Sequence, residues 1–325
     1  MTDRNKKRTL GGNLQKLLAL GALVILYVFF AFFGRGFFSL PTFINILASS
    51  YYIGFMAIGV TFVIITGGID LSIGTNMMCA ALVGGVAYRN WGWSIGMALA
   101  LSVVLATCFG LLNGIMIAKL KLPPFIATLG TMLVTQGFGA IVSKVQTMSY
   151  PTVTEDDGWF KQVFYQTRGR FPSGVVWLVV FFLIAFIVLN KTRVGRYTFA
   201  IGSNEEATRL SGVNVDNWKI LIYTICGFFA GLAAIVYSAA YTSIIPGSGG
   251  GLELSAIAGV VIGGTSMAGG AGTMVGTMIG VYIMSVLRQG LMSMNLQGHW
   301  QTFFTGLVVI GAVLLDIYRN KKQAK

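Results

Sequence analysis

The chain has 325 residues, of which 55% are hydrophobic and only 10% charged. Soluble domains carry about 25% charged residues, so this chain could not cover a globular surface in water, and a soluble enzyme, a disordered protein and a secreted disulfide scaffold are excluded. A net charge of +13 would suggest nucleic acid for a soluble protein, but the basic residues gather at the edges of apolar segments, so we expect no nucleic-acid partner.

Long uncharged segments predict an all-α integral membrane protein, a polytopic bundle of about ten transmembrane helices with broken or re-entrant segments. A helix that spans the bilayer needs about 20 apolar residues. The predicted helices lie near residues 17–34, 43–66, 71–88, 94–118, 124–143, 174–190, 219–242, 254–267, 272–292 and 300–316. Glycines interrupt the eighth, which we expect to be the weakest span, a half-helix or a re-entrant segment. Every proline falls at a helix start or in a loop, as its missing N–H requires.

Basic residues concentrate in the short cytoplasmic loops of membrane proteins, so their positions predict the orientation of the chain. Five of them precede the first segment, which lacks the small-residue cleavage site of a signal peptide and is expected to stay as a membrane helix. Basic clusters place segments 1–16 and 319–325 in the cytoplasm, together with a long loop at 191–218 within the membrane domain 17–318. The near-neutral loop 144–173 is expected outside. Cytoplasmic termini require an even number of crossings.

Two polar, glycine-rich breaks interrupt apolar segments at comparable places in the two halves of the chain, at residues 66–74 and 263–272. Unwound backbone at membrane depth is tolerated only where protein or a water-filled cavity satisfies its polar groups, and paired breaks indicate a translocation route. Turns at the cytoplasmic surface would give the same pattern, and the sequence leaves both interpretations open. The candidate residues of the route are Thr66, Gly67, Gly68, Asp70, Ser72, Gly263, Gly264, Thr265 and Ser266.

Three ionisable residues lie at or near such flexible segments. Asp70, within the first break, would cap the helix that begins near Leu71 or contact a substrate, because ionisable residues inside a membrane are generally functional. Glu253 follows the glycine-rich turn 246–251, and Arg288 lies near the external end of the ninth helix. The same two kinds of role, structural and functional, stay open for both.

The loop between the sixth and seventh predicted helices contains a short helix of about two turns. Ser203 and Glu206 have the spacing of a capping box, and Gly212 is placed to end the helix. A helix this short is not stable alone, and its main apolar residues, Ala207 and Leu210, are too few for a membrane-surface anchor. We therefore expect it to dock into a groove of another protein.

The sequence offers no catalytic or metal-binding constellation. Cys79, Cys108 and Cys226 lie in apolar segments, where a thiol behaves as a small hydrophobic group, and His299 stands beside Trp300 as an expected interfacial anchor. No segment resembles the phosphate loop Gly-x-x-x-x-Gly-Lys-Ser/Thr. We expect no metal and no cofactor in this chain, and if transport uses ATP, another subunit must bind the nucleotide.

Four motifs stand in the order typical of one transporter family: GGIDLSIG at 67–74, PFIATLGTM at 124–132, GSNEEATRLSGVNV at 202–215 and VVIGGTSMAGGAGT at 260–273. From about residue 40 to residue 316, the chain resembles the permease subunit of ribose-type ATP-binding cassette sugar importers. The resemblance implies a permease that works as a pair in the bacterial inner membrane, a cytoplasmic ATPase with two nucleotide-binding cassettes, and a periplasmic sugar-binding protein. It also implies that the short helix couples the permease to the ATPase. The candidate coupling residues are Ser203, Asn204, Glu205, Glu206, Ala207, Arg209, Leu210, Ser211 and Gly212.

The favoured function is therefore the membrane pathway of a monosaccharide importer, for ribose or a related sugar, driven by a separate ATPase. A branched-chain amino acid permease of the same superfamily is a second hypothesis, although a zwitterionic substrate suits breaks rich in hydroxyl groups and glycine poorly. An ion-coupled secondary transporter is a third, and that class usually places more ionisable residues in its helices than this chain has.

Overall fold

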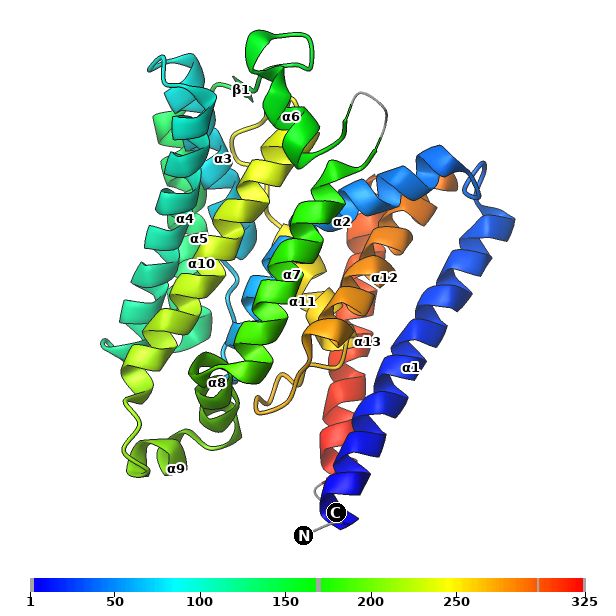
Figure 1. Ribbon diagram of the computed structural model, residues 1–325, viewed down its shortest axis with the longest axis vertical. Coiled ribbons are helices and arrows are strands. Elements are labelled where there is room, and N and C mark those ends of the chain that lie inside the picture. Colours follow the sequence, from blue (N-terminus) through cyan, green and yellow to red (C-terminus); the bar gives the residue numbers. More distant parts are fainter. Residues whose placement is uncertain (1–2, 168–170, 297, 324–325) are drawn as a thin grey trace.

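The computed structural model describes residues 3–167, 171–296 and 298–323, and most of them are helical (Figure 1). Seven helices among these residues are long and apolar enough to cross a bilayer. They are α2 (Leu40–Ile65), α4 (Ile95–Ala118), α5 (Pro124–Val142), α7 (Ser173–Lys191), α10 (Val215–Ala240), α12 (Met274–Ser293) and the apolar part of α13 (Gly298–Gln323). The other elements are α1 (Asp3–Phe33), α3 (Ile73–Arg89), α6 (Trp159–Phe164), α8 (Arg193–Ser203), α9 (Glu205–Leu210), α11 (Leu252–Ile262), the 3-10 turn η1 (Asp156–Gly158), β1 (Met148–Ser149) and β2 (Ser243–Ile244).

The ten predicted helices are confirmed as α1 to α5, α7 and α10 to α13, with two notable changes of boundary. The first helix begins at Asp3 rather than near residue 17. Residues 3–16 include three Lys and two Arg, which favour helix. The eighth ends at Ile262 rather than residue 267. Gly264, two residues further on, has a φ of +97° that a continuing helix does not allow.

Two of the crossings combine a helix with extended chain. An 11-residue helix such as α11 is about 16 Å long, half the roughly 30 Å of the hydrocarbon core. The loop 245–251 descends from β2 to the start of α11, so that loop and half-helix together traverse the bundle (Figure 1). In the first half of the chain, residues 66–72 precede α3 in the same way. The eighth segment is thus a half-helix, one of the two possibilities expected from its glycines.

The core of the bundle surrounds α2. Residues 50–65 of α2 are all buried, and this helix packs against α7, α10, α11 and α12. Helix α3 is buried from residue 73 to residue 87 between α4, α5 and α10. The outer helices α4, α5, α7 and α13 instead expose apolar side chains such as Val104, Leu133 and Ile187, which is the surface expected toward lipid.

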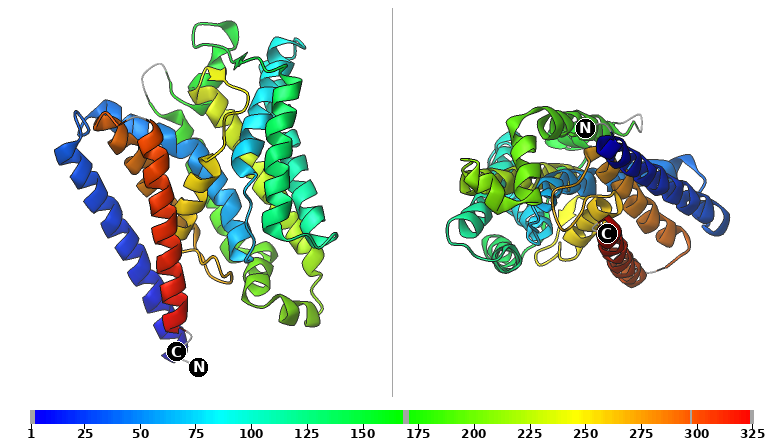
Figure 2. Two further views of the ribbon diagram at one scale, coloured as in Figure 1. Left: turned by 180° about the vertical axis from the view of Figure 1, so that it is seen from behind. Right: turned by 90° about the horizontal axis from the view of Figure 1, so that it is seen from below.

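Helix α1 lies at the periphery with α12 and α13 (Figure 2). It begins at the end of the bundle where α13 finishes, and α9 lies toward the same end (Figure 1). Both ends of the described chain therefore lie on one side, in agreement with an even number of crossings.

The opposite end of the bundle carries the predicted external loop. Within it, β1 pairs antiparallel with β2, in the register Met148 with Ile244 and Ser149 with Ser243. Arg89, in the last turn of α3, forms an ion pair with Glu155 at 3.2 Å. The loop 144–173 is thus tied to α3 and to the strand that follows α10. Arg168 and Arg170, which contribute to the near-neutral charge of the loop, lie outside the described residues.

Small residues let α11 and α12 approach closely, as their small-xxx-small spacing predicts. A Cβ on Gly276 would overlap the carbonyl oxygen of Gly263, and a Cβ on Gly280 would overlap that of Gly259. The two helices therefore meet backbone to backbone, and α12 fixes the position of the half-helix.

Candidate translocation and coupling site

The two glycine-rich breaks, far apart in sequence, lie against each other at the end of the bundle that carries α9 (Figure 1). The N–H of Gly270 donates to the carbonyl of Ile65, the last residue of α2, at 2.8 Å. A Cβ on Gly269 would lie 2.9 Å from the nitrogen of Gly67, and both glycines have a positive φ, a conformation that favours glycine. This is the arrangement expected if the breaks turn at one surface of the membrane.

The last turn of α8 joins the same contact. A Cβ on Gly202 would overlap the carbonyl oxygen of Ile65, and a Cβ on Gly270 would lie 3.0 Å from the Cα of Ser203. Three segments therefore meet through their backbones: the end of α2, the second break and the end of α8. Because close-packed interiors transmit displacement, α8 cannot move toward the bundle without moving both breaks.

The second break is also held by Asp316, a residue that sequence reasoning did not single out. Asp316 is buried in α13, and its Oδ2 accepts hydrogen bonds from the N–H of Met267 at 3.0 Å and from the hydroxyl of Ser266 at 3.2 Å. Asp316 is a single acidic residue directly after the uncharged segment 289–315, and this position in the sequence could have indicated a role for it. The contact ties the last helix of the chain to the loop that follows α11.

The first break carries Asp70 into the interior of the bundle. Its Oδ1 accepts hydrogen bonds from the N–H of Ser72 at 2.9 Å and from the hydroxyl of Ser72 at 2.6 Å. That hydroxyl accepts from the amide of Asn113 at 2.9 Å, and Thr131 donates to the other end of the same amide at 2.5 Å. All four side chains are buried. Helix α3 begins at Ile73 with Ser72 as its N-cap, so the prediction that Asp70 caps it is wrong: Asp70 instead accepts the N–H of the cap residue, just before the helix.

The remaining candidate residues of the breaks divide between the two loops. The hydroxyl of Thr66 donates to the carbonyl of Val63 at 2.6 Å, which closes the end of α2. Gly68 lies beside the hydroxyl of Tyr223, too close to accept a Cβ. Thr265 is buried, and its hydroxyl has no hydrogen-bond partner among the described residues. The structure therefore places the Thr66 to Gly68 turn and the second break at one end of the bundle, and Asp70 and Ser72 deeper inside.

Helix α9 confirms the predicted short helix but not its cap. Asn204, not Ser203, is the N-cap, and its side chain accepts the N–H of Ala207 at 2.9 Å. Ser203 belongs instead to α8, an 11-residue helix in a segment that was predicted as loop. Gly212, with a φ of +82°, follows the end of α9 as predicted. Leu210 is 82% exposed, so the helix presents an apolar side chain that the described residues leave uncovered.

Ion pairs fix α9 to the start of α10. Glu205 pairs with Lys219 at 2.6 Å, and Arg209 pairs with Asp216 at 2.8 Å and with Glu205 at 3.4 Å. Burial acts to raise the pKa of Glu205, but the hydrogen bonds and charges of Lys219 and Arg209 outweigh it and hold that pKa below its ordinary value. The carboxylate is therefore the stable form at neutral pH, and α9 is anchored through its charged side while Leu210 stays free.

The lowered pKa of Glu205 predicts that its ion pairs with Lys219 and Arg209 are lost at acid pH. A carboxyl group whose pKa is lowered by folding stabilises the fold above its unfolded pKa of about 4.3, and this contribution disappears as the pH falls through the lowered value. Glu205→Gln should destabilise the protein at pH 7 by about 0.2–1 kcal/mol, the range for exposed ion pairs. Thermal unfolding of both proteins across this pH range should show the difference vanishing in acid. Glu206→Gln, at an exposed neighbouring position, is the control, and a difference independent of pH would contradict the assignment.

A groove of about 370 Å³ lies between α8 and α9. Its lining is largely apolar and comes from residues of both helices and the turn after them: Tyr197, Ala200, Ser203, Asn204, Ala207, Thr208, Ser211 and Val213. Four of these are candidate coupling residues, Ser203, Asn204, Ala207 and Ser211. Ala207 and Thr208 of α9 line this groove, and we call the groove together with the exposed residues of α9 the α8–α9 surface.

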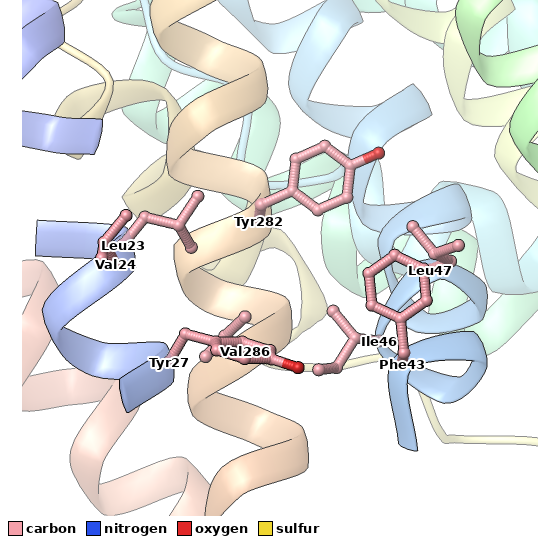
Figure 3. A pocket seen from close by; sticks show the side chains of 8 residues that line it. All are labelled: Leu23, Val24, Tyr27, Phe43, Ile46, Leu47, Tyr282 and Val286. Carbon is pink, nitrogen blue, oxygen red and sulfur yellow. The ribbon is translucent and has the colours of Figure 1, made fainter. Parts of the chain in front are cut away.

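A second recess, of about 380 Å³, lies on the flank of the bundle between α1, α2 and α12 (Figure 3). Leu23, Val24 and Tyr27 of α1 face Phe43, Ile46 and Leu47 of α2 across it, with Tyr282 and Val286 of α12 forming the floor. The lining contains no charged residue and none of the residues of the breaks or the α8–α9 surface. The recess is therefore separate from the candidate site.

The bundle with broken helices and an exposed short helix at one end has the architecture of the membrane part of an ATP-binding cassette transporter. The fold is similar to that of a metal-chelate type ABC transporter in an inward-facing conformation, with a TM-score of 0.51 and 16% identity, and the likeness covers 93% of this chain and 99% of that one. At this identity the similarity concerns the fold alone.

The sequence identifies the family within this class. Residues 42–313 match the family described as "Branched-chain amino acid transport system / permease component". The chain is 39% identical to the ribose import permease protein RbsC of Escherichia coli, over 94% of each chain, and 32% identical to the fructose import permease protein FrcC of Rhizobium meliloti, over 92% of this chain and 84% of that one. The chain belongs to this family of transport-system permeases, and it is a multi-pass protein of the bacterial inner membrane. The resemblance expected from the four motifs is confirmed.

Proposed function

We propose that the chain is the membrane-spanning permease subunit of an ATP-binding cassette importer and forms the pathway for a monosaccharide, ribose or a related sugar. One observation carries the proposal: α9, with its exposed Leu210, is joined through α8 to both glycine-rich breaks. Movement of α9 is therefore transmitted to the breaks through α8. The substrate class is supported by the relatives, which are named as ribose and fructose import permeases.

The end of the bundle that carries α9 faces the cytoplasm in this proposal. Basic residues are concentrated in cytoplasmic loops, and Lys191, Arg193 and Arg196 lie in the loop 191–218 at that end. The basic segments 1–16 and 319–325 then lie on the same side of the membrane domain 17–318. The loop 144–173, with β1 and α6, faces outward.

The candidate residues of the breaks take two roles along the route. Residues 66–68 and the second break, which includes 263–266, close its cytoplasmic end, and Gly269 and Gly270 of that break make the contact with the end of α2 and with α8. Asp70 and Ser72 hold the start of α3 deeper in the bundle. Residues 203–212 form the coupling segment, so that movement of α9 opens or closes the contact between the breaks.

Three partners follow from this role. A separate cytoplasmic ATPase with two cassettes binds the ATP, because the sequence of this chain has no phosphate loop, and the chain itself is a transport subunit without a cofactor or metal. A second copy of the chain completes the route, because Ile245 and Gly247 are exposed in an irregular loop and such backbone is not tolerated against lipid. A periplasmic sugar-binding protein delivers the sugar at the outward end.

The docking of α9 is tested with the double substitution Glu206→Lys and Leu210→Asp. Both side chains are exposed, so the variant should insert and fold normally while losing co-purification with its ATPase, because a buried charge replaces the apolar contact. Leu210→Met, which keeps the apolar contact, is the matched control and should co-purify at the normal level. Normal co-purification of the double variant would refute the coupling role of α9.

A branched-chain amino acid is the second candidate substrate, because the description of the matching family names it. An amino acid carries both an ammonium and a carboxylate group, and the described residues of the second break contain no charged side chain of their own. Ribose fits these hydroxyl- and glycine-rich segments better.

A further inference from the structure

The N-terminal ends of two helices meet inside the bundle, at the start of α3 and the start of α11. A Cβ on Gly74 of α3 would lie 2.5 Å from Oε2 of Glu253, 2.9 Å from the nitrogen of Glu253 and 3.0 Å from the carbonyl oxygen of Gly249. Only glycine at position 74 leaves room for the Glu253 carboxyl group. Both helices follow extended chain, so this junction lies where the two broken crossings change from loop to helix (Figure 1).

One oxygen of the Glu253 carboxyl group is unpaired at this junction. Glu253 is 6% exposed, and its Oε1 accepts the N–H of Gly251 at 2.8 Å. Its Oε2 is buried and has no hydrogen-bond partner among the described residues, and none of their ion pairs includes Glu253. A buried acceptor without a donor is costly, which indicates that a donor comes from outside the chain.

The loop that runs over Glu253 is suited to admit such a donor. Gly247, Gly249 and Gly251 all have a positive φ, and glycine gives this backbone freedom that other residues lack. A Cβ added to Gly247, Gly250 or Gly251 would meet nothing within 4 Å. The loop therefore borders open space on one side and contacts the Glu253 carboxyl group on the other.

We propose that Oε2 of Glu253 accepts a hydrogen bond from a hydroxyl group of the transported sugar as it passes the α3–α11 junction. Hydroxyl groups supply the missing donor, because each carries an O–H that can donate to Oε2. This assignment rests on the proposed function in sugar import, and it identifies Glu253 as a residue of the translocation route that contacts the sugar.

The test compares two substitutions of similar size in the complete transporter, reconstituted in vesicles with its ATPase and binding protein. Glu253→Gln keeps an acceptor oxygen, whereas Glu253→Met removes it. We expect the methionine variant to import labelled ribose about tenfold more slowly per ATP hydrolysed, the factor for loss of one hydrogen bond at the upper end of the usual range. The glutamine variant should stay within about threefold of the wild type, because its amide oxygen still accepts.

Thermal unfolding separates this role from a structural one. Glu253→Met removes the unpaired Oε2 but also Oε1, the acceptor of the Gly251 N–H, so the two effects on the unfolding temperature oppose each other and a small net change is expected. A marked fall in both stability and ATP hydrolysis would show a structural role and overturn the assignment. Ribose import by Glu253→Met at the wild-type rate would overturn it as well. Import of leucine and not ribose by the wild-type transporter would overturn the proposed function itself.

Discussion

Gly280→Ala is expected to destabilise the protein strongly by forcing α11 away from α12. The added methyl group would overlap the carbonyl oxygen of Gly259, a backbone atom that cannot rotate aside as a side chain does. Overpacking of a tight interior costs about 1–3 kcal/mol and occasionally more, and a backbone obstruction belongs at the upper end. Thermal unfolding of the detergent-solubilised protein measures the loss directly.

Gly130→Ala is the matched control for this prediction. It adds the same methyl group to a membrane helix, α5, but its Cβ would meet nothing within 4 Å. Alanine favours helix over glycine by about 0.8–1 kcal/mol, so this variant should be as stable as the wild type or more stable. Equal unfolding temperatures for the two variants would mean that the glycine contact between α11 and α12 is not a tight one.

The membrane helices were predictable because lipid allows few backbone conformations. A segment in lipid must satisfy its backbone within itself, so long apolar segments with prolines at their starts, such as Pro41 and Pro124, predict helices almost directly. The close packing of Gly276 and Gly280 was also visible, because small residues at this spacing mark helix contacts in membranes. The end of α9 before Gly212 was predictable for a similarly local reason, because glycine readily adopts the positive φ that ends a helix.

The cap of α9 could not be predicted from the local pattern. Ser203 and Asn204 are both good capping residues, and the capping-box spacing to Glu206 favoured the serine. The choice is made by α8, which continues through Ser203 because Gly202 fits against the carbonyl of Ile65. That contact joins residues more than a hundred positions apart, and no short sequence window contains it.

The convergence of the two breaks is a long-range feature for the same reason. Sequence spacing showed two similar interruptions and left open whether they line a route or turn at a surface. Their contact depends on the hydrogen bond from Gly270 to Ile65 and on the hydrogen bond from Ser266 to Asp316. Each is a pairing between distant elements, so the candidate residues could be identified while their arrangement could not.

Asp70→Ala is expected to cause the second large loss of stability, through the start of α3. The substitution removes the acceptor for both the N–H and the hydroxyl of Ser72, and both groups stay buried. A side-chain hydrogen bond in a membrane protein contributes only about 0.6 kcal/mol on average, so the loss of bonds alone would be small. Each buried polar group left without a partner costs about 1–3 kcal/mol, and this penalty makes the effect large.

Two further variants test whether the loss of stability follows the number of buried polar groups left without a partner. Asp70→Asn keeps an acceptor oxygen in place and should lose much less stability than Asp70→Ala. Thr131→Val removes the donor to the buried Oδ1 of Asn113, so it leaves one group without a partner where Asp70→Ala leaves two, and should cost about half as much. If Asp70→Ala unfolds at the same temperature as Thr131→Val, the groups around Ser72 have found other partners, and Asp70 is then free to serve the route rather than the fold.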